Sequence, residues 1–276
     1  MTTTSAPARA RRRSPSFGSL GVGMAVLWLS IIVLLPLAAL AATALDGGIG
    51  GFWDAITAPG ALASLRITVL VSVVVALINV VFGTMIAWVL VRDEFPGKRF
   101  VNGIIDLPFA LPTIVASIVL LSLYGPGSPI NVHLNATKAG LIVALAFVTL
   151  PFVVRSVQPV LMELDRDVEQ AAASLGAGNL TILRKVVLPV LAPAILGGAG
   201  LAFARAIGEF GSIILIGGNI RGETQVTSQY IQQLLEMDRS SDAAATSVVL
   251  LAIAFVTLLV LRVLSNRATR REEQDT

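Results

Sequence analysis

The run LASLRITVLVSVVVALINVVFGTMIAWVLV, residues 62–91, carries a single charge, at Arg66. A helix of roughly 20 consecutive apolar residues crosses the hydrocarbon core of a bilayer, so this run is long enough to span a membrane. Over the whole chain, 55% of the residues are hydrophobic and 13% charged, and the mean hydropathy is +0.83. A soluble globular protein has no interior large enough to hide that composition. We therefore predict an all-α integral membrane protein.

Five further runs pass the same length test and bring the prediction to six transmembrane helices. The second and fifth are longer than a perpendicular crossing needs, which indicates tilt or a cytoplasmic extension. Together the six form one predicted membrane domain, residues 20–264. The predicted spans are Leu20–Thr43, Leu62–Val91, Val101–Tyr124, Gly140–Val160, Val187–Ile216 and Ala243–Leu264.

Lys and Arg residues near the ends of spans indicate the cytoplasmic side of a membrane protein. In the six-span arrangement, the side opposite the termini holds only Lys138, Arg221 and Arg239, and most other basic residues fall on the side of the termini. We therefore predict a multi-pass protein of the plasma (inner) membrane with both termini in the cytoplasm. The basic residues assigned to that side are Arg9, Arg11, Arg12, Arg13, Arg92, Lys98, Arg99, Arg155, Arg166, Arg184, Lys185, Arg262, Arg267, Arg270 and Arg271.

The two ends of the chain are predicted to be cytoplasmic tails, residues 1–19 and 265–276. The first is rich in Ser, Pro and Arg, which is typical of disorder. A cleaved signal peptide is the competing interpretation. We disfavour it because the apolar run after Arg13 exceeds the roughly 7–15 residues of a signal-peptide core.

The sequence contains no recognisable catalytic apparatus. It has no cysteine, no phosphate-binding loop of the form GxxxxGK[ST], no GxSxG and no HExxH. Its one histidine, His133, lies in a predicted external loop with no second ligand to share a metal. We therefore predict no catalytic residue, no metal site and no cofactor bound by this chain.

The connection after the fourth span, LMELDRDVEQAAASLGAG at residues 161–178, predicts a short cytoplasmic helix. Asp167 is expected to cap it with Gln170 in a capping box, Glu169 suits the positive end of the helix dipole, and Gly176 supplies a left-handed stop. About two helical turns are unstable alone, so the helix must pack on something. Its alanine-rich face fits either a groove on a partner protein or lipid headgroups, and the residues alone leave both open.

The same segment is similar to a family signature. Gln170-Ala171-Ala172, Gly176, Val186 and Leu188-Pro189 resemble the EAAxxxG(x9)IxLP motif of ATP-binding-cassette (ABC) importer permeases. That resemblance implies a coupling helix between spans 4 and 5, within residues 165–186, which docks on a separate ATPase. Gln170 stands where the family usually has Glu, so docking by shape is better supported than docking by charge. The implied ATPase-coupling residues are Asp167, Glu169, Gln170, Ala171, Ala172 and Gly176.

Further motifs narrow the resemblance to sulfate and thiosulfate permeases of the CysT type, within the CysTW family and its MetI-like, type-1 transmembrane domain. They are Phe95-Pro96-Gly97, the stretches 106–113 (DLPFALPT) and 151–161 (PFVVRSVQPVL), Gly208-Glu209-Phe210-Gly211, Gly218-Asn219-Ile220 and the stretch 224–228 (TQVTS).

The resemblance implies a permease subunit of an ATP-driven importer that contributes no residue to hydrolysis. The implied partners are a homologous CysW-like permease, two CysA-like ATPase subunits that use ATP and Mg²⁺, and a periplasmic or lipid-anchored sulfate-binding protein, with lipid around the spans and no nucleic acid. Ile220–Thr224 is also similar to the W subunit and to molybdate permeases. A molybdate or tungstate permease is therefore the near alternative, and a secondary transporter the distant one.

Polar groups inside the spans suggest where an anion would pass. Arg205 and Glu209 lie one helical turn apart, and an unpaired Arg at mid-bilayer is costly, so we expect them to pair. The pair either attracts an anion or locks the fifth span to a neighbour, and we favour the structural role. Pro108 and Pro112, like Pro151 and Pro159, are expected to break helices and free backbone groups suited to an oxyanion. The candidate path residues are Pro108, Pro112, Thr113, Ser117, Arg205, Glu209 and Ser212.

Overall fold

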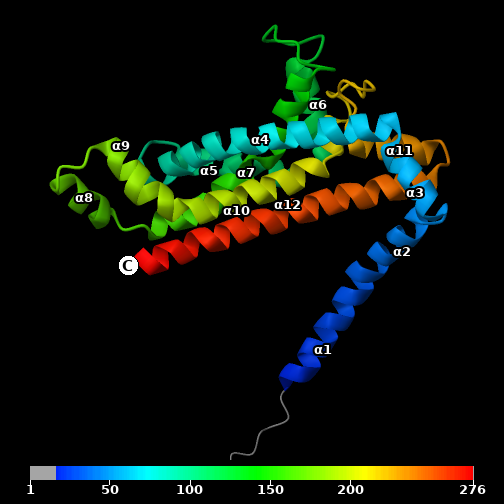
Figure 1. The fold of residues 1–276 in the computed structure, drawn as a ribbon. Helices are drawn as coiled ribbons and strands as arrows, with labels where there is room; N and C mark the ends of the chain where they lie inside the picture. Colours follow the sequence, from blue (N-terminus) through cyan, green and yellow to red (C-terminus); the bar gives the residue numbers. More distant parts are fainter. Residues whose placement is uncertain (1–16, 276) are drawn as a thin grey trace, which may run out of the picture.

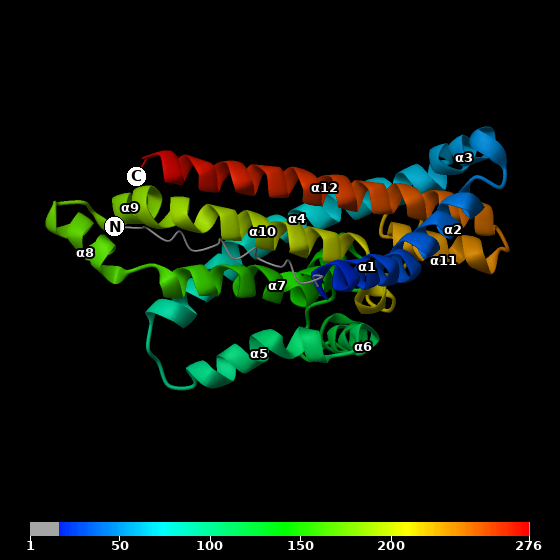
Figure 2. The ribbon, with the colours of Figure 1, turned by 90° about the horizontal axis from the view of Figure 1, so that it is seen from below.

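The computed structural model describes residues 17–275, which are helical with no strand over that range (Figure 1). Four long helices run side by side and form the body of the protein (Figures 1 and 2). The central helix of the four, α10, contacts each of the other three. The all-α prediction is confirmed. The four helices are α4 (Pro59–Arg92), α7 (Lys138–Glu163), α10 (Leu188–Ile207) and α12 (Ser240–Asp275).

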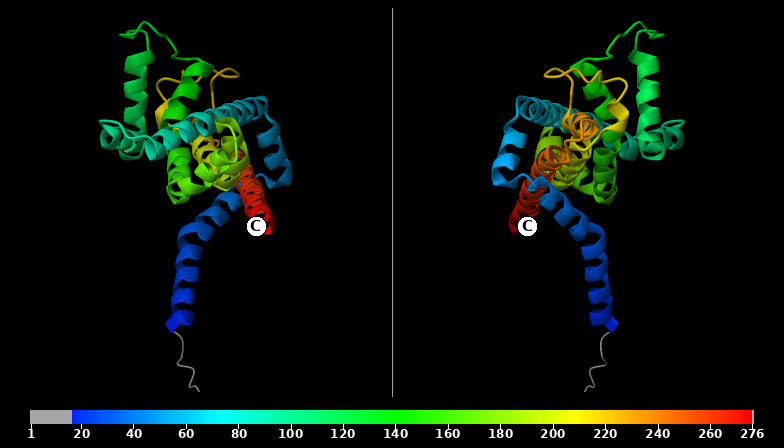
Figure 3. Two further views of the ribbon diagram at one scale, coloured as in Figure 1. Left: turned by 90° about the vertical axis from the view of Figure 1, so that its left-hand side faces the viewer. Right: turned by 90° about the vertical axis from the view of Figure 1, so that its right-hand side faces the viewer.

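The first span leaves this body at an angle. It consists of α1 (Phe17–Leu29), a π-helical turn η1 (Ser30–Leu34) and α2 (Leu35–Ala44), and it points away from the other helices (Figure 3). Its apolar part, Gly21–Ala44, buries almost nothing against the rest of the chain. A short helix, α3 (Gly48–Thr57), then leads into α4. Residues 1–16 of the predicted N-terminal tail lie outside the described residues.

The third predicted span is not one continuous helix. It is a pair of helices, α5 (Lys98–Ala110) and α6 (Thr113–Tyr124), bent by 115°. The break comes at Pro112, which lacks an N–H and holds Leu111 in an extended conformation. A break at Pro112 was expected. Pro108, however, lies inside α5, and Pro151 and Pro159 lie inside α7, without ending these helices. The described residues thus contain five unbroken spans, or six if the bent pair counts as one.

The fifth span is shifted from its predicted position. Its helical run is Asn179–Ile207 and comprises α9 (Asn179–Ile182), a π-helical turn η2 (Leu183–Val187) and α10, so it ends well before Ile216. Glu209 explains the early end, because its carboxylate accepts a hydrogen bond from the Ser212 N–H and draws the backbone into a turn. A 3₁₀ turn, η3 (Gly211–Ile213), and α11 (Thr227–Glu236) follow. At the other end, α12 continues as a helix to Asp275 where a tail was predicted from residue 265.

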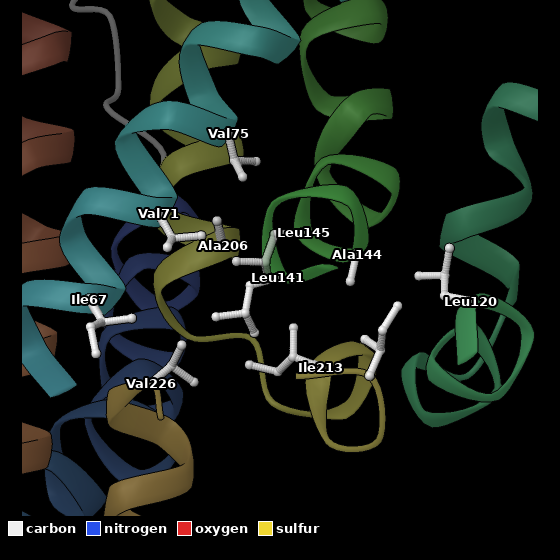
Figure 4. Packing of buried hydrophobic residues seen from close by; sticks show 11 residues of the cluster. Ile67, Val71, Val75, Leu120, Leu141, Ala144, Leu145, Ala206, Ile213 and Val226 are labelled. Carbon is white, nitrogen blue, oxygen red and sulfur yellow. The ribbon is translucent and has the colours of Figure 1, made fainter. Parts of the chain in front are cut away.

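Two large hydrophobic clusters hold α4, α7 and α10 together, and two smaller ones attach α12. The first joins α4, α7 and α10 to α6 and η3, as Figure 4 shows for Ile67, Val71, Leu141, Leu120 and Ile213. The second lies toward the other end of the same helices, around the C-terminal end of α7 and the start of α10. The short helix α8 (Arg166–Ser174) lies at that end, beside α9 and near the C-terminal end of α12 (Figures 1 and 2).

Candidate functional site

The start of α6 packs tightly against the turn that follows α10. The Leu215 N–H donates a hydrogen bond of 3.1 Å to Ser117 Oγ. At Gly211 the approach is closer still: a Cβ added there would lie 2.1 Å from Thr113 Oγ1 and 3.1 Å from the Ile114 nitrogen. Only glycine fits at that contact, so the bent span and the η3 turn form one unit.

A buried carboxylate organises the turn. Glu209 is 2% exposed, and its Oε1 accepts a hydrogen bond of 2.8 Å from the Ser212 N–H. Its Oε2 forms an ion pair with Arg205, one turn earlier on α10. Ser228 on α11 donates through Oγ to the Glu209 carbonyl oxygen at 2.8 Å. The predicted pairing is confirmed, and the pair fixes a turn of its own chain.

Two polar groups around this turn are candidates for contact with a ligand. The Arg205 side chain is about a third exposed although its charge is paired. Ser212 is fully buried, and its Oγ has no hydrogen-bond partner among the described residues. Buried hydroxyls are normally satisfied, and an orphan one calls for an explanation such as a missing ligand or water. Ser212 is the clearest such group in the unit.

The structure brings most of the predicted path residues together. Contacts from Gly211 to Thr113 and from Leu215 to Ser117 enclose Ser212, and Glu209 links that turn to Arg205. Pro112 lies just before the first residue of α6. Pro108 lies in α5, before the break, and is not part of this group's contacts. Gly211 was quoted only as part of a motif. The polar residues Glu209 and Ser212 and the glycines Gly208 and Gly211, within an otherwise apolar run, are the signal that could have indicated a turn.

The second predicted site, α8, is a short capped helix as expected, but the cap differs. Asp165, not Asp167, is the N-cap residue: its side chain accepts a hydrogen bond of 2.9 Å from the Asp167 N–H. Asp165 is the cap because it precedes the first helical residue, Arg166, and has the extended backbone conformation that an N-cap needs. Asp167 falls within the first turn, where its negative charge still suits the helix dipole.

The C-terminal end of α8 is as predicted. Gly176 has φ of +88°, the left-handed conformation that favours glycine. The Gly176 N–H bonds to the Ala173 carbonyl oxygen at 2.9 Å, and the Ala177 N–H to that of Ala172 at 3.0 Å. These two bonds make a Schellman motif, which satisfies carbonyl groups that the helix leaves free.

The two faces of α8 have different surroundings. On the inner face, Ala172 packs against the second hydrophobic cluster and Glu169 forms an ion pair with Arg92, the last residue of α4. Glu169 is therefore already paired within the chain. Asp167, Gln170 and Ala171 are exposed on the other face. Beyond the helix two leucines stand out from the surface, Leu175 at 89% and Leu180 at 66% exposure.

One polar cluster escaped the sequence prediction. Arg155 on α7 bonds through Nε and an NH2 group to both carboxylate oxygens of Asp106 on α5, at 2.7 and 2.5 Å. It also donates to Asn102 Oδ1 at 2.9 Å and to Gln158 Oε1 at 2.5 Å. This network fastens the bent span to α7. Nothing in the local pattern joins residues 49 positions apart, so only the fold reveals it.

Comparison with known families identifies the kind of protein that has this architecture. A family model described as "Binding-protein-dependent transport system inner membrane component" matches residues 79–270. The chain belongs to this family. It is therefore a multi-pass inner-membrane permease component of a transport system, not an enzyme.

Individual relatives agree over almost the whole length. The chain is 41% identical over 269 residues to the sulfate transport system permease protein CysT of Salmonella typhimurium, covering 95% of this chain and 96% of that protein. It is 37% identical over 252 residues to the protein of the same name from Synechocystis. That match covers 89% of this chain and 88% of that protein. The resemblance to the CysT type is confirmed by these matches.

Solved structures support the fold. A chain from the crystal structure of a bacterial alginate ABC transporter, in complex with a periplasmic protein that binds an alginate pentasaccharide, superposes with a TM-score of 0.77 at 17% identity, covering 91% of this chain and 94% of that one. A chain of the MetNI methionine ABC transporter in an inward-facing conformation superposes with a TM-score of 0.56 at 19% identity. The match covers 76% of this chain and 94% of that one. The helical arrangement is that of ABC transporter permeases.

Proposed function

We propose that this chain is the membrane-spanning permease subunit of an ATP-driven importer of sulfate or thiosulfate. The observation that carries the proposal is the 41% identity, over 95% of the chain, to a sulfate transport system permease protein. Identity at that level over the full length covers both the spans and the segment around α8. The chain forms the translocation path and leaves ATP hydrolysis to a separate subunit.

The path runs past the unit formed by the start of α6 and the turn after α10. Sulfate is a dianion, and uncharged donors bind it without the permanent counter-charge that would trap it. Ser212 Oγ is a buried hydroxyl with no partner, and Thr113 lies directly against the same turn. The Arg205 charge is balanced by Glu209, so it contributes a weak field at the edge of the path. Pro112 makes the bend that lines the path, Ser117 ties α6 to the turn through the Leu215 N–H, and Pro108 lies in α5 before the bend.

The coupling site is the exposed side of α8 and the turn after it. Asp167, Gln170 and Ala171 face outward, and the stop at Gly176 presents Leu175 to solvent. An apolar side chain so exposed at a helix end fits a pocket on a partner surface. Ala172 and Glu169 act from the inner face by holding α8 to the spans. Docking therefore depends on shape and apolar contact, in keeping with the uncharged Gln170.

The complete transporter contains this chain, a CysW-like permease, two CysA-like ATPases that bind ATP and Mg²⁺, and a periplasmic or lipid-anchored sulfate-binding protein. Both termini face the cytoplasm, which places α8 on the side of the ATPases. Closure of the ATPases on ATP pulls on α8 and switches the spans from inward-facing to outward-facing. The binding protein then releases its anion toward Ser212.

Radiolabelled sulfate uptake in cells that lack this chain tests the proposal. We expect uptake to be lost and then restored by the wild-type gene, with a large excess of unlabelled thiosulfate competing better than molybdate. Unchanged sulfate uptake in the deleted strain would contradict the substrate assignment. Inhibition by molybdate alone would favour the molybdate alternative, to which Ile220–Thr224 is similar.

Affinity purification of the tagged chain tests the assembly. We expect a second, different permease and an ATPase to co-purify. A complex with two copies of this chain and no second permease would instead fit the homodimeric molybdate type.

A further inference from the structure

Several groups converge on Arg92, at the end of α4 that lies beside α8. Its guanidinium group stacks over the Trp88 ring at 5.8 Å from the centroid. One NH2 group forms the ion pair with Glu169 of α8 and donates to the carbonyl oxygen of Leu164, which ends α7, at 3.3 Å. Arg166 of α8 in turn donates to the Arg92 carbonyl oxygen at 3.1 Å. The ends of α4 and α7 and the start of α8 thus meet at one side chain.

The ion pair is shielded from solvent on both sides. The Arg92 side chain is 10% exposed and that of Glu169 22%. A pair shielded to that degree is screened by salt much less than a surface pair. Arg92 Nε is buried with no partner among the described residues, so the guanidinium group holds Glu169 through one nitrogen only.

Few other bonds hold α8 to the spans. Among the side chains that the structure describes, residues 21–267, each hydrogen bond that joins α8 to a membrane-spanning helix involves Arg92. The remaining attachment is apolar, where Ala172 packs on the second hydrophobic cluster. Apart from the backbone on either side of α8, a displacement of this helix therefore reaches the spans through Arg92 and the packing of Ala172.

The helix that carries Arg92 reaches the candidate path. α4 is an unbroken helix of 34 residues, about 50 Å long at 1.5 Å per residue. Toward its other end, Ile67, Val71 and Val75 pack in the cluster that contains Leu120 of α6 and Ile213 of η3 (Figure 4). One rigid element thus touches both the coupling helix and the unit around Ser212.

We propose that Arg92 is a positioning residue that, through Glu169, transmits the movement of α8 to α4 and so to the translocation path. The inference rests on the proposed function, because it assumes that an ATPase moves α8. It assigns to Glu169 a role inside the chain, in place of the contact with the ATPase that the sequence suggested. Neither residue touches the anion.

The test uses the complete transporter in proteoliposomes and measures sulfate transported per ATP hydrolysed. We expect Arg92→Gln and Glu169→Gln each to assemble with the ATPase and hydrolyse ATP, and to lose at least tenfold in that ratio. The double variant should be no worse than either single variant, because one interaction is removed in all three. Arg92→Lys should retain most of the ratio, since a single N–H contact suffices. Glu94→Gln, which changes an exposed carboxylate paired with Lys98 at the same end, is the matched control and should match the wild type.

Three results would overturn the inference: an unchanged ratio in the single variants, additive losses in the double variant, or failure of both single variants to assemble, which would make the pair purely structural. Failure of the proposed function would give a different experimental result. In that case the wild-type complex itself moves no sulfate on addition of ATP.

Discussion

At the scale of single residues, Glu209 has the most demanding position. It is almost fully buried and serves two partners, Arg205 and the Ser212 N–H. Neutralising one partner of a fully buried ion pair costs on the order of 3–5 kcal/mol, and the cost here is smaller because the Arg205 side chain is about a third exposed to solvent.

We predict that Glu209→Gln lowers the unfolding temperature of the purified protein by several degrees. Arg205 then keeps its charge without a partner, and the turn around Ser212 loosens. The measurement is a thermal unfolding curve in detergent. Glu223→Gln, in an exposed loop, is the control and should leave the curve unchanged. Equal unfolding temperatures for the two variants would show that the pair contributes nothing to stability.

Two neighbouring glycines in α10 provide a matched comparison of packing. A Cβ at Gly198 would lie 2.9 Å from Val153 Cα and 3.1 Å from Ser156 Cβ, both on α7, whereas a Cβ at Gly197 meets nothing within 4 Å. We predict that Gly198→Ala destabilises the protein by about 1–3 kcal/mol through overpacking. Gly197→Ala should be neutral or slightly stabilising, since alanine favours a helix. Denaturation of the two variants side by side checks this, and a neutral Gly198→Ala would mean that α7 and α10 are not in close contact.

At the scale of elements, the turn after α8 allows the proposed docking of the ATPase to be tested without disturbing the fold. Leu175 is exposed and contributes almost no burial to the chain, so Leu175→Asp should leave the amount of protein in the membrane unchanged. We predict that the same change strongly reduces co-purification of the ATPase, because it places a charge at the proposed apolar contact. Ile220→Asp, in the loop at the opposite end, is the control for adding a charge. Normal recovery of the ATPase with Leu175→Asp would argue against docking at this turn.

The elements also show how far the sequence alone could lead. Hydropathy was sufficient for the long spans, and Pro112 for the break between α5 and α6, since both are local signals. The end of α10 at Ile207 was missed because it depends on the Glu209 carboxylate folding back to Ser212. The paired state of Glu169 was missed because Arg92 is 77 positions away. The candidate path residues were chosen by residue type and spacing and stay a prediction, whereas the close contact at Gly211 could be found only from the fold.

At the scale of the whole molecule, long packed helices run from one end of the protein to the other, and the bent pair α5 and α6 packs beside them. The unbroken helices α4, α7 and α10 connect the end that carries α8 to the end that carries η3, with no break in the backbone of α4 or α7. The Arg155 network fastens α5 to α7, so the bent span moves with the body. α1 and α2 are almost wholly exposed and have the apolar surface expected of a helix that faces lipid.

The central claim is that this permease, with its partners, moves sulfate across a membrane at the expense of ATP. The most direct measurement is the accumulation of radiolabelled sulfate in proteoliposomes that contain the purified transporter, with the sulfate-binding protein on one side and ATP on the other. We predict uptake that requires both ATP and the binding protein, and that falls to background when this chain is omitted. Sulfate uptake that persists without this chain, or a complete complex that hydrolyses ATP and accumulates no sulfate, would contradict the account.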